Sequence, residues 1–175
     1  MTTFYFIRHG EVDLSEANTK IYQGHGHHML TLSPKGIGQI IEAARSPILK
    51  DAELILTSPY GRALHSAAIL SRELRLDIKV ETDLHEWLAD GQTFAYLSDE
   101  EAEKRYSELN RNHGVHPQDQ NCLWETAEQM KRRVYAVLER YRQYTAVIVV
   151  CHGTLMQYVL DIPHPKNGEI AALVL

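Results

Sequence analysis

The sequence predicts an α/β protein with three layers, α/β/α, around a mostly parallel central sheet. Two observations lead to this prediction. Short apolar runs rich in β-branched and aromatic residues, typical of buried strands, occur at residues 3–7, 52–58 and 145–151. Segments with apolar residues three or four positions apart lie between these runs. Strands that alternate with helices indicate βαβ units, whose parallel sheet is covered by helices on both faces.

Length and composition predict one ordinary globular domain over residues 1–175. The chain is 44% hydrophobic and 23% charged, and it contains no repeat, low-complexity tract or linker-like run. The net charge of −5 argues against a nucleic-acid partner, because nucleic-acid binders normally present a basic face.

Nothing at the N-terminus resembles a targeting segment. No basic segment precedes the apolar residues of "MTTFYFIRHG", and this apolar run is far shorter than the roughly 20 residues of a membrane span. Cys122 and Cys151 are the only cysteines, which makes a disulfide framework improbable. We therefore expect a cytoplasmic protein with reduced thiols and no membrane partner.

The first half of the chain opens with a strand at 3–7 and a long loop at 12–32. Ser33 as N-cap and Pro34 at the first helical position predict the first helix. The strand at 52–58 follows. A second Ser-Pro pair then predicts a helix that begins at Ser58 and Pro59 and ends near Leu74.

The second half begins with a short strand at 77–81 and an irregular segment at 82–97. Ser98 with Glu101 forms a capping box that opens a polar helix. The remaining predicted elements are a helix at 124–143, a strand at 145–151, a short helix at 154–161 and a last strand at 169–175.

Charged side chains follow the ends of the predicted strands. Arg8 and His9 come after the first strand, Arg62 in the turn after the second, Glu86 after the third and His152 after the fourth. Ligands bind beyond the carboxyl ends of the strands in such sheets, so we expect these five side chains to converge on one site.

The residue types at these positions favour phosphoryl chemistry. The guanidinium fork of Arg62 matches phosphate oxygens, and a helix N-terminus beside it or beside His152 attracts anions. A neutral imidazole is a competent nucleophile toward phosphorus. Glu86 is the best-placed acid to protonate a leaving alkoxide, with Asp83 and Glu11 as alternatives.

Four motifs give the chain a resemblance to the histidine phosphatase superfamily, which includes the cofactor-dependent phosphoglycerate mutases. They are "FIRHGEV" with Arg8 and His9, "LTSPYGRALHSA" with Arg62, "LHEW" with Glu86 and "VVCHGTL" with His152. Their order and spacing match the family along almost the whole chain. Weaker similarities are "QG" at 23–24, "LSPKGIGQ" at 32–39, and Glu125-Thr126 with Arg133-Val134.

The resemblance implies a phosphoglycerate mutase-like fold and a role for each of the five residues. His9 would form a phosphohistidine, Arg8, Arg62 and His152 would bind the phosphoryl group, and Glu86 would act as general acid and then base. The resemblance implies no metal and no cofactor. It also makes 87–122 a small variable cap region.

Three histidines, His25, His27 and His28, crowd the loop "QGHGHHML". They are open to three interpretations: a metal site, solvated side chains, or residues that touch the substrate, since this loop borders the active site in the family. Ser15 stands where the family commonly has an Asn that contacts phosphate. The residues that we expect to line the substrate are Ser15, Gln23, Gly24, His25, His28 and Trp87.

The predicted function is hydrolysis of a small phosphorylated metabolite such as a sugar phosphate or nucleotide. The alternatives are mutase-type phosphoryl transfer and a non-catalytic sensor of a phosphorylated ligand. We expect a monomer or homodimer. Trp87, Tyr96 and Trp124 are expected either to pack in the core or to stack on a sugar or base.

Overall fold

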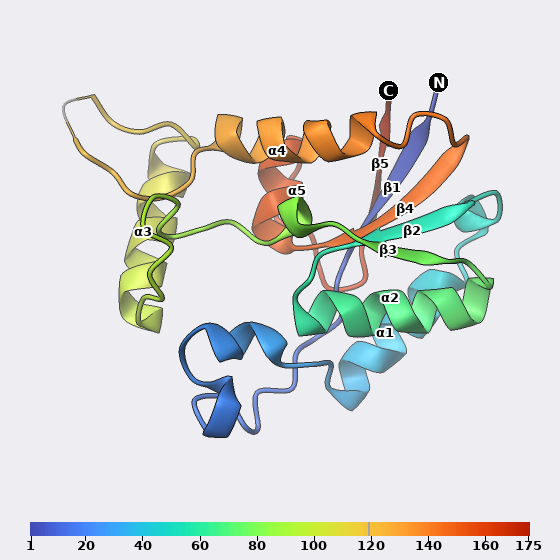
Figure 1. Cartoon of the computed structure of the whole chain (residues 1–175), viewed down its shortest axis with the longest axis horizontal. Helices are drawn as coiled ribbons and strands as arrows, with labels where there is room; N and C mark the ends of the chain where they lie inside the picture. The colour runs from blue at the N-terminus through green and yellow to red at the C-terminus, as the bar shows by residue number, and fades with distance from the viewer. Residues whose placement is uncertain (119) are drawn as a thin grey trace.

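The computed structural model describes residues 1–118 and 120–175 and contains a five-stranded sheet in the order β3-β2-β4-β1-β5 (Figure 1). Four strands pair in parallel, and β5 runs antiparallel to β1 at one edge. This arrangement confirms the predicted mostly parallel sheet. The strands are β1 (Thr3–Arg8), β2 (Leu54–Thr57), β3 (Ile78–Val80), β4 (Ala146–Cys151) and β5 (Ile170–Val174).

Helices cover both faces of the sheet, which gives the three predicted layers (Figure 1). Side chains alternate between the faces of a strand, so Val147 and Val149 of β4 pack in one core while Ile148 and Val150 pack in the other. The first core lies under α4 and α5, and the second under α1 and α2. The helices are α1 (Pro34–Ala44), α2 (Gly61–Leu74), α3 (Asp99–Arg111), α4 (Ala127–Glu139) and α5 (Gly153–Val159).

Helix starts follow the predicted caps at Ser33 and Ser98, and a third cap, at Thr126, was not predicted. The hydroxyl groups of Ser33, Ser98 and Thr126 accept hydrogen bonds from backbone N–H groups at the starts of α1, α3 and α4. The predicted start of α2 at Ser58 is wrong, because the helix begins three residues later at Gly61. The helix expected at 124–143 begins later too, since its capping box lies at Thr126.

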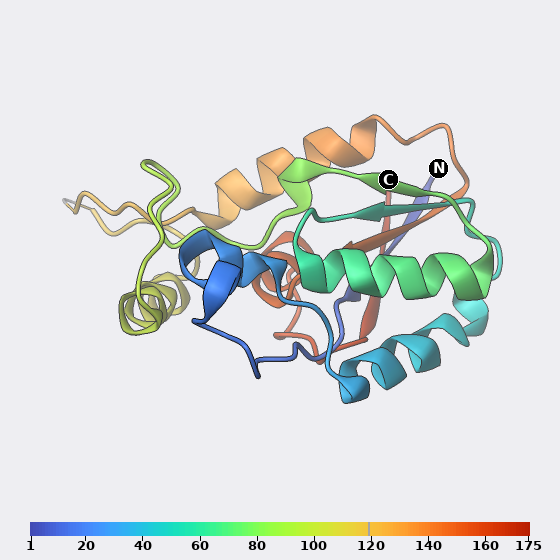
Figure 2. The same ribbon diagram turned by 60° about the horizontal axis from the view of Figure 1, so that its bottom comes forward.

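The region predicted as a loop at 12–32 contains two short 3₁₀ turns, η1 (Lys20–Tyr22) and η2 (Gly24–Met29), and a bridge between Val12 and Leu32. Figure 2 shows this segment next to the start of α2 and to the chain that leads to α3. We call residues 87–122, which include α3, the cap segment. Within the part of the chain that the structure describes, no helix has the length and apolarity needed to cross a membrane.

Gly10 and Gly36 allow α1 to pack directly against the chain that follows β1. A side chain on Gly10 would lie 2.3 Å from the carbonyl oxygen of Gly36, and one on Gly36 would lie 2.1 Å from that of Glu11. The two glycines therefore permit a close backbone approach. This contact fixes the segment immediately after His9.

Candidate active site

Parallel pairing brings the ends of three strands to one edge of the sheet. Arg8 pairs with Cys151, and Thr57 pairs with Val150. The next residues along the chain, among them His9, therefore emerge side by side. The backbone N–H of His9 also donates to the carbonyl of Cys151 at 3.0 Å.

His9 is a neutral imidazole with one nitrogen aimed at the site. Its ring Nδ1 lies 2.7 Å from the carbonyl oxygen of Gly10, and Arg62 Nε donates to its Nε2 at 3.2 Å. Because a carbonyl only accepts and a guanidinium only donates, the proton sits on Nδ1 and the lone pair on Nε2. Burial and then the charge of Arg62 lower the pKa of His9 to about 3.

His152 lies beside His9, with 5.2 Å between the ring centroids. Its Nε2 is 2.7 Å from Ser58 Oγ, and that oxygen accepts from the backbone N–H of Tyr60. The Ser58 proton has no other acceptor among residues 1–118 and 120–175, so we assign Ser58 as donor to Nε2. Burial and then the charge of Arg62 lower the pKa of His152. The ring is therefore neutral and carries its proton on Nδ1.

Two buried donors at this site have no acceptor within the described residues. One is Nδ1 of His152, and the other is Nε of Arg8, whose Nη1 donates to the carbonyl of Pro165 at 2.6 Å. A buried donor without an acceptor is costly. The His152 ring lies beside His9, and the charge of Arg8 acts on the His9 ring. An anion that reaches both donors would satisfy them.

Glu86 faces the start of α5. Its carboxylate accepts from the backbone N–H groups of Thr154 at 3.2 Å and Leu155 at 3.0 Å. Its negative charge also acts on Arg8 and Arg62, whose pKa values are lowered chiefly by burial and partly restored by Glu86. The carboxylate therefore belongs to the same group of side chains as His9.

The two alternative acids are placed differently. Glu11 forms an ion pair with Lys35 and accepts from the hydroxyl of Ser33. Asp83 is exposed on η4 (Thr82–Leu84). Of the three carboxylates, only Glu86 is bound to the backbone beside His152.

An ion pair holds the segment that carries Glu86. Arg133 Nε lies 2.6 Å from Glu125 Oε1, and the two side chains are 13% and 7% exposed. Arg133 also donates to the backbone carbonyl of His85, and Glu125 accepts from the N–H of Leu88. The pair thus binds the backbone on both sides of Glu86. This gives a structural role to the weaker similarity noted in the sequence, Glu125-Thr126 with Arg133-Val134.

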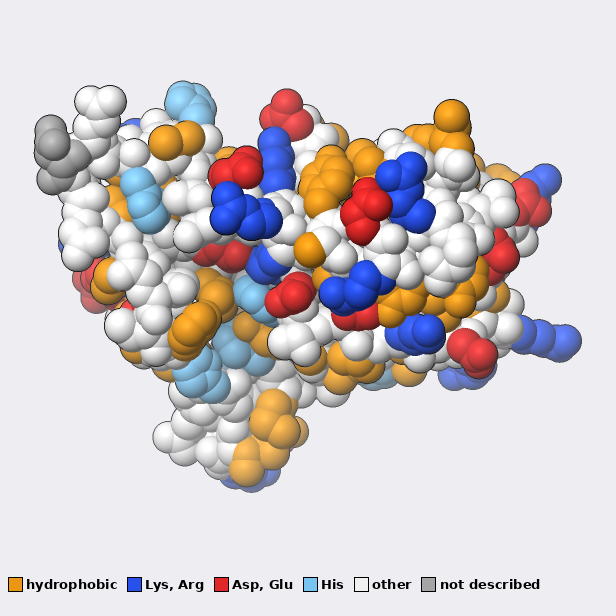
Figure 3. Space-filling view, turned by 45° about the horizontal axis from the view of Figure 1, so that its top comes forward, with side chains coloured by type: hydrophobic (Ala, Val, Ile, Leu, Met, Phe, Trp, Pro, Cys, Tyr) orange, Lys and Arg blue, Asp and Glu red, His pale blue; other side chains and the backbone are white. Residues whose placement is uncertain are grey.

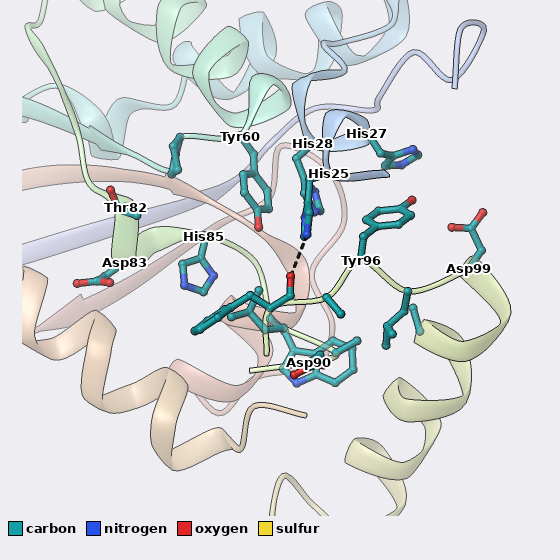
Figure 4. A pocket seen from close by; sticks show the side chains of 18 residues that line it. His25, His27, His28, Tyr60, Thr82, Asp83, His85, Asp90, Tyr96 and Asp99 are labelled. Atoms are coloured by element: carbon teal, nitrogen blue, oxygen red, sulfur yellow. Dashed lines mark hydrogen bonds between the residues drawn. The ribbon is translucent and has the colours of Figure 1, made fainter. Parts of the chain in front are cut away.

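A cavity of about 610 Å³ adjoins these residues. Histidine and hydrophobic side chains gather at the hollow in Figure 3, and Figure 4 shows Tyr60, His28 and Tyr96 directed toward the cavity. We call it the aromatic cavity. Its walls come from η2, the turn before α2, the segment around His85 and the cap segment.

The predicted substrate-lining residues divide into two groups. His25, His28 and Trp87 line the aromatic cavity, together with His27. Ser15, Gln23 and Gly24 do not: the N–H of Ser15 bonds Asp13, and the Gln23 side chain bonds the Lys20 carbonyl. Tyr96 lines the cavity as well, whereas Trp124 is 1% exposed and packs in the core.

The three loop histidines do not converge on one point. Nε2 of His25 lies 2.9 Å from the carbonyl oxygen of Phe94, and the His28 ring stacks on Tyr60 at 4.1 Å. Within residues 1–118 and 120–175, no group of three or more His, Cys, Asp or Glu side chains is arranged to hold a metal ion.

Sequence patterns did not reveal several residues of the site. Tyr60 and His85 lie next to predicted residues, but nothing in the sequence indicated that their rings face the cavity. Asn167, whose side chain donates to the His9 carbonyl at 2.9 Å, and His164, which lies against Gly153, belong to the loop before β5. Ser58, Tyr60 and His85 lie inside the quoted motifs, whereas Asn167 and His164 lie outside all of them.

Comparison with known proteins places the chain in a family. The family model described as histidine phosphatase superfamily (branch 1) matches residues 4–164. A comparison with curated proteins finds no match.

Solved structures resemble the whole chain at low sequence identity. A mycobacterial glucosyl-3-phosphoglycerate phosphatase has a TM-score of 0.72 and 19% identity, covering 99% of this chain and 90% of that chain. An Escherichia coli protein described as an alpha-ribazole-5'-P phosphatase has a TM-score of 0.66 and 22% identity, covering 98% and 89%. A complex of the mycobacterial phosphatase with inorganic phosphate has a TM-score of 0.69 and 18% identity, covering 99% and 90%. These likenesses confirm the predicted phosphoglycerate mutase-like fold.

Proposed function

Because the chain belongs to branch 1 of the histidine phosphatase superfamily, we propose that it hydrolyses a phosphomonoester of a small metabolite through phosphorylated His9. The observation that carries this proposal is the pair of unsatisfied buried donors, Arg8 Nε and His152 Nδ1, beside a neutral His9. With Arg62 they supply the positive charge and hydrogen bonds that a transferring phosphoryl group requires.

In the first step, Nε2 of His9 attacks phosphorus while the bond between phosphorus and the ester oxygen breaks. Arg8, Arg62 and His152 bind the phosphoryl oxygens. Glu86 in its acid form gives its proton to the leaving alkoxide, so that the alcohol departs neutral. The products of this step are phospho-His9, the alcohol and the Glu86 carboxylate.

In the second step, the Glu86 carboxylate takes a proton from water as the water oxygen attacks phosphorus. The bond between His9 Nε2 and phosphorus breaks, and its electron pair returns to the imidazole. Inorganic phosphate leaves, and Glu86 is again an acid. The cycle consumes one water for each ester and uses only side chains of this protein.

The phosphatase is proposed to need no metal ion. The test is hydrolysis of p-nitrophenyl phosphate in excess EDTA, with His9→Ala as the inactive variant. His113→Asn serves as a matched control, because His113 is exposed and outside the aromatic cavity and Asn tolerates its positive φ of 51°. Full activity in EDTA for the wild type and the control is expected. Loss of activity on chelation would contradict the metal-free route.

Two observations favour hydrolysis over mutase-type transfer and over a sensor. The named structural neighbours above are described as phosphatases. A sensor requires no acid, whereas Glu86 is held beside His152 by backbone hydrogen bonds. The cap segment is proposed to cover the leaving group, because its residues form one wall of the aromatic cavity.

A further inference from the structure

The geometry points to a flat, uncharged aromatic ring as the leaving-group side of the substrate, bound in the aromatic cavity beside Tyr60. This inference rests on the proposed function and narrows it from phosphomonoesters in general to one class. It also excludes a class: esters whose leaving group carries a second anionic group, such as a carboxylate or another phosphate.

Tyr60 connects the cavity with the phosphate-binding residues. Its ring lies 5.2 Å from the ring of His152, and the Arg62 guanidinium carbon lies 5.0 Å from its centroid. Tyr60 also stacks on His28 in the cavity wall. A phosphoryl group held by Arg62 and His152 therefore has its ester oxygen next to the Tyr60 end of the cavity.

The cavity walls are aromatic, and their rings are arranged as a stacking surface. His28 lies parallel to Tyr60 with 4.1 Å between centroids and 13° between planes, and Tyr96 meets His25 edge-on at 5.5 Å (Figure 4). Trp87 lines the same space. Aromatic rings prefer offset stacks and edge contacts with other rings, so these walls fit a planar guest better than a puckered polyol.

Two histidines of the cavity, His28 and His85, contribute hydrogen-bonding nitrogens without charge. Burial and then Arg62 lower the pKa of His28 to about 4, and burial lowers the pKa of His85. Nδ1 of His85 lies 2.7 Å from the carbonyl oxygen of Glu86, which can only accept. His85 Nε2 is therefore an acceptor. A heteroaromatic ring with an N–H or O–H group is a suitable partner for it.

No lysine or arginine is among the described residues that line the cavity. Its charged lining residues are Asp83, Asp90 and Asp99. The Asp90 carboxylate is used locally, because it accepts from the N–H groups of Gln92 and Thr93. A second anionic group on the substrate would thus lose its hydration and meet carboxylates instead of cations.

The size of the cavity suits a ring system. A volume of about 610 Å³ is within the range of pockets that enclose small organic ligands. The contact between His25 and the Phe94 carbonyl joins η2 to the cap segment across one side of the cavity. This contact bounds the site that the ring would occupy on that side.

Binding of phosphonates tests the inference independently of turnover, because the carbon–phosphorus bond is not hydrolysed. Calorimetry on the wild type would compare benzylphosphonate, cyclohexylmethylphosphonate, methylphosphonate and phosphonoacetate. Benzylphosphonate is expected to bind at least about tenfold more tightly than methylphosphonate and about threefold more tightly than its cyclohexyl analogue. Tightest binding of phosphonoacetate, or equal binding of the benzyl and cyclohexylmethyl compounds, would overturn the inference.

Two variants of His28 test whether the preference for benzylphosphonate arises in the aromatic cavity. In His28→Ala, the ratio of benzylphosphonate to methylphosphonate affinity is expected to fall by about tenfold, whereas the control His113→Asn keeps the wild-type ratio. In His28→Lys, phosphonoacetate is expected to gain at least about tenfold relative to benzylphosphonate, because a cation then lines the cavity. An unchanged ratio in both His28 variants would contradict the assignment of the cavity.

Turnover separates this inference from the proposed function. If the wild type hydrolyses benzyl phosphate with a kcat/KM at least about tenfold above that for 3-phosphoglycerate, the proposed function and the aromatic leaving group are both supported. If the order of these two esters is reversed, the function stands and the aromatic class is wrong. If no phosphomonoester is hydrolysed while benzylphosphonate binds tightest, the function fails and the cavity assignment stands.

Discussion

The state of His9 decides the chemistry at the scale of single residues. Its proton is fixed on Nδ1 by the Gly10 carbonyl, and its lone pair on Nε2 accepts a hydrogen bond from Arg62 Nε. Burial and the charge of Arg62 lower the pKa of His9 to about 3. The ring therefore stays neutral, with its single proton on Nδ1, throughout the mildly acidic range. The proposed nucleophile therefore needs no deprotonation before it attacks phosphorus.

Substitution of Glu86 by Gln separates acid catalysis from phosphate binding. Phosphorylation of His9 by benzyl phosphate is expected to slow by about 10²–10³-fold, because its alkoxide must be protonated as it leaves. Phosphorylation of His9 by p-nitrophenyl phosphate is expected to slow by less than about tenfold, since p-nitrophenolate departs without a proton. The values of kcat/KM for the two esters measure the difference, because they report the steps up to phospho-His9 and leave out the attack of water, which also uses Glu86. Equal losses on both would remove Glu86 from the role of general acid.

The sequence predicted the positions of the charged residues better than those of the residues that hydrogen-bond or pack against them. Arg8 and His152 follow strongly apolar runs, so their place at the edge of a parallel sheet could be predicted. Ser58 could not be assigned to His152, because Ser followed by Pro is also a typical helix start. The residues that line the aromatic cavity depend on how η2 and the cap segment fold together, which no local pattern describes.

At the scale of elements, the start of α4 controls the position of Glu86. Glu125 precedes the helix and Arg133 lies two turns along it, so that their ion pair reaches the backbone of His85 and Leu88. The capping box at Thr126 sets where the helix begins. We therefore propose Arg133 as a positioning residue for Glu86, the proposed general acid.

Removing the cation of this pair tests the positioning role. Arg133→Met is expected to lower the free energy of unfolding by about 3–5 kcal/mol, because the Glu125 carboxylate is left buried without a partner. Urea unfolding measures the change. The matched control is Arg142→Met, whose pair with Glu139 is 45% and 56% exposed and is expected to contribute less than about 1 kcal/mol.

Kinetic measurements distinguish a role of Arg133 in positioning Glu86 from a role in stability alone. Arg133→Met is expected to lose more activity on benzyl phosphate than on p-nitrophenyl phosphate, as Glu86→Gln does. The double variant Arg133→Met with Glu125→Met should regain stability and still show this leaving-group dependence. A uniform loss on both esters would make the pair purely structural.

The boundaries of the elements show where local patterns fall short. The expected helix at 124–143 includes Trp124 at its start, although the helical spacing of its apolar residues runs from Ala127 to Tyr141. In the structure the Trp124 side chain is fully packed before the helix begins, with the His116 ring edge-on at 4.4 Å. The helix therefore begins where this spacing begins, and not at Trp124. The strands were predicted closely, because their apolar runs are short and continuous.

At the scale of the whole molecule, two separate cores, one on each face of the sheet, fix the strand ends that carry the site. Helices α1 and α2 cover one face of the sheet and α4 and α5 cover the other, so the strand ends carrying His9 and His152 are fixed from both sides (Figure 1). Both imidazoles are buried in this frame, at 6% and 0% exposed. Their uncharged state is therefore linked to the folded state of the entire domain.

This linkage predicts a loss of stability in mild acid. The pKa of both histidines is lower in the folded protein than the ordinary value of 6.5, so below pH 6.5 the unfolded chain binds protons that the folded protein does not. The free energy of unfolding is expected to fall by up to about 1.4 kcal/mol per pH unit for each of them. Urea unfolding between pH 7 and pH 5 measures the slope, which should be smaller in His9→Gln. Stability that is constant or rises toward pH 5 would contradict this account.

Formation of phospho-His9 tests the central claim most directly. The wild type would be mixed with p-nitrophenyl phosphate in EDTA, quenched in alkali within milliseconds, digested and analysed by mass spectrometry. We predict an acid-labile phosphate on the peptide that contains His9, formed and lost at rates that account for turnover, and no phosphopeptide in His9→Ala. Turnover without any phosphate on His9, or phosphate on another residue, would contradict the account.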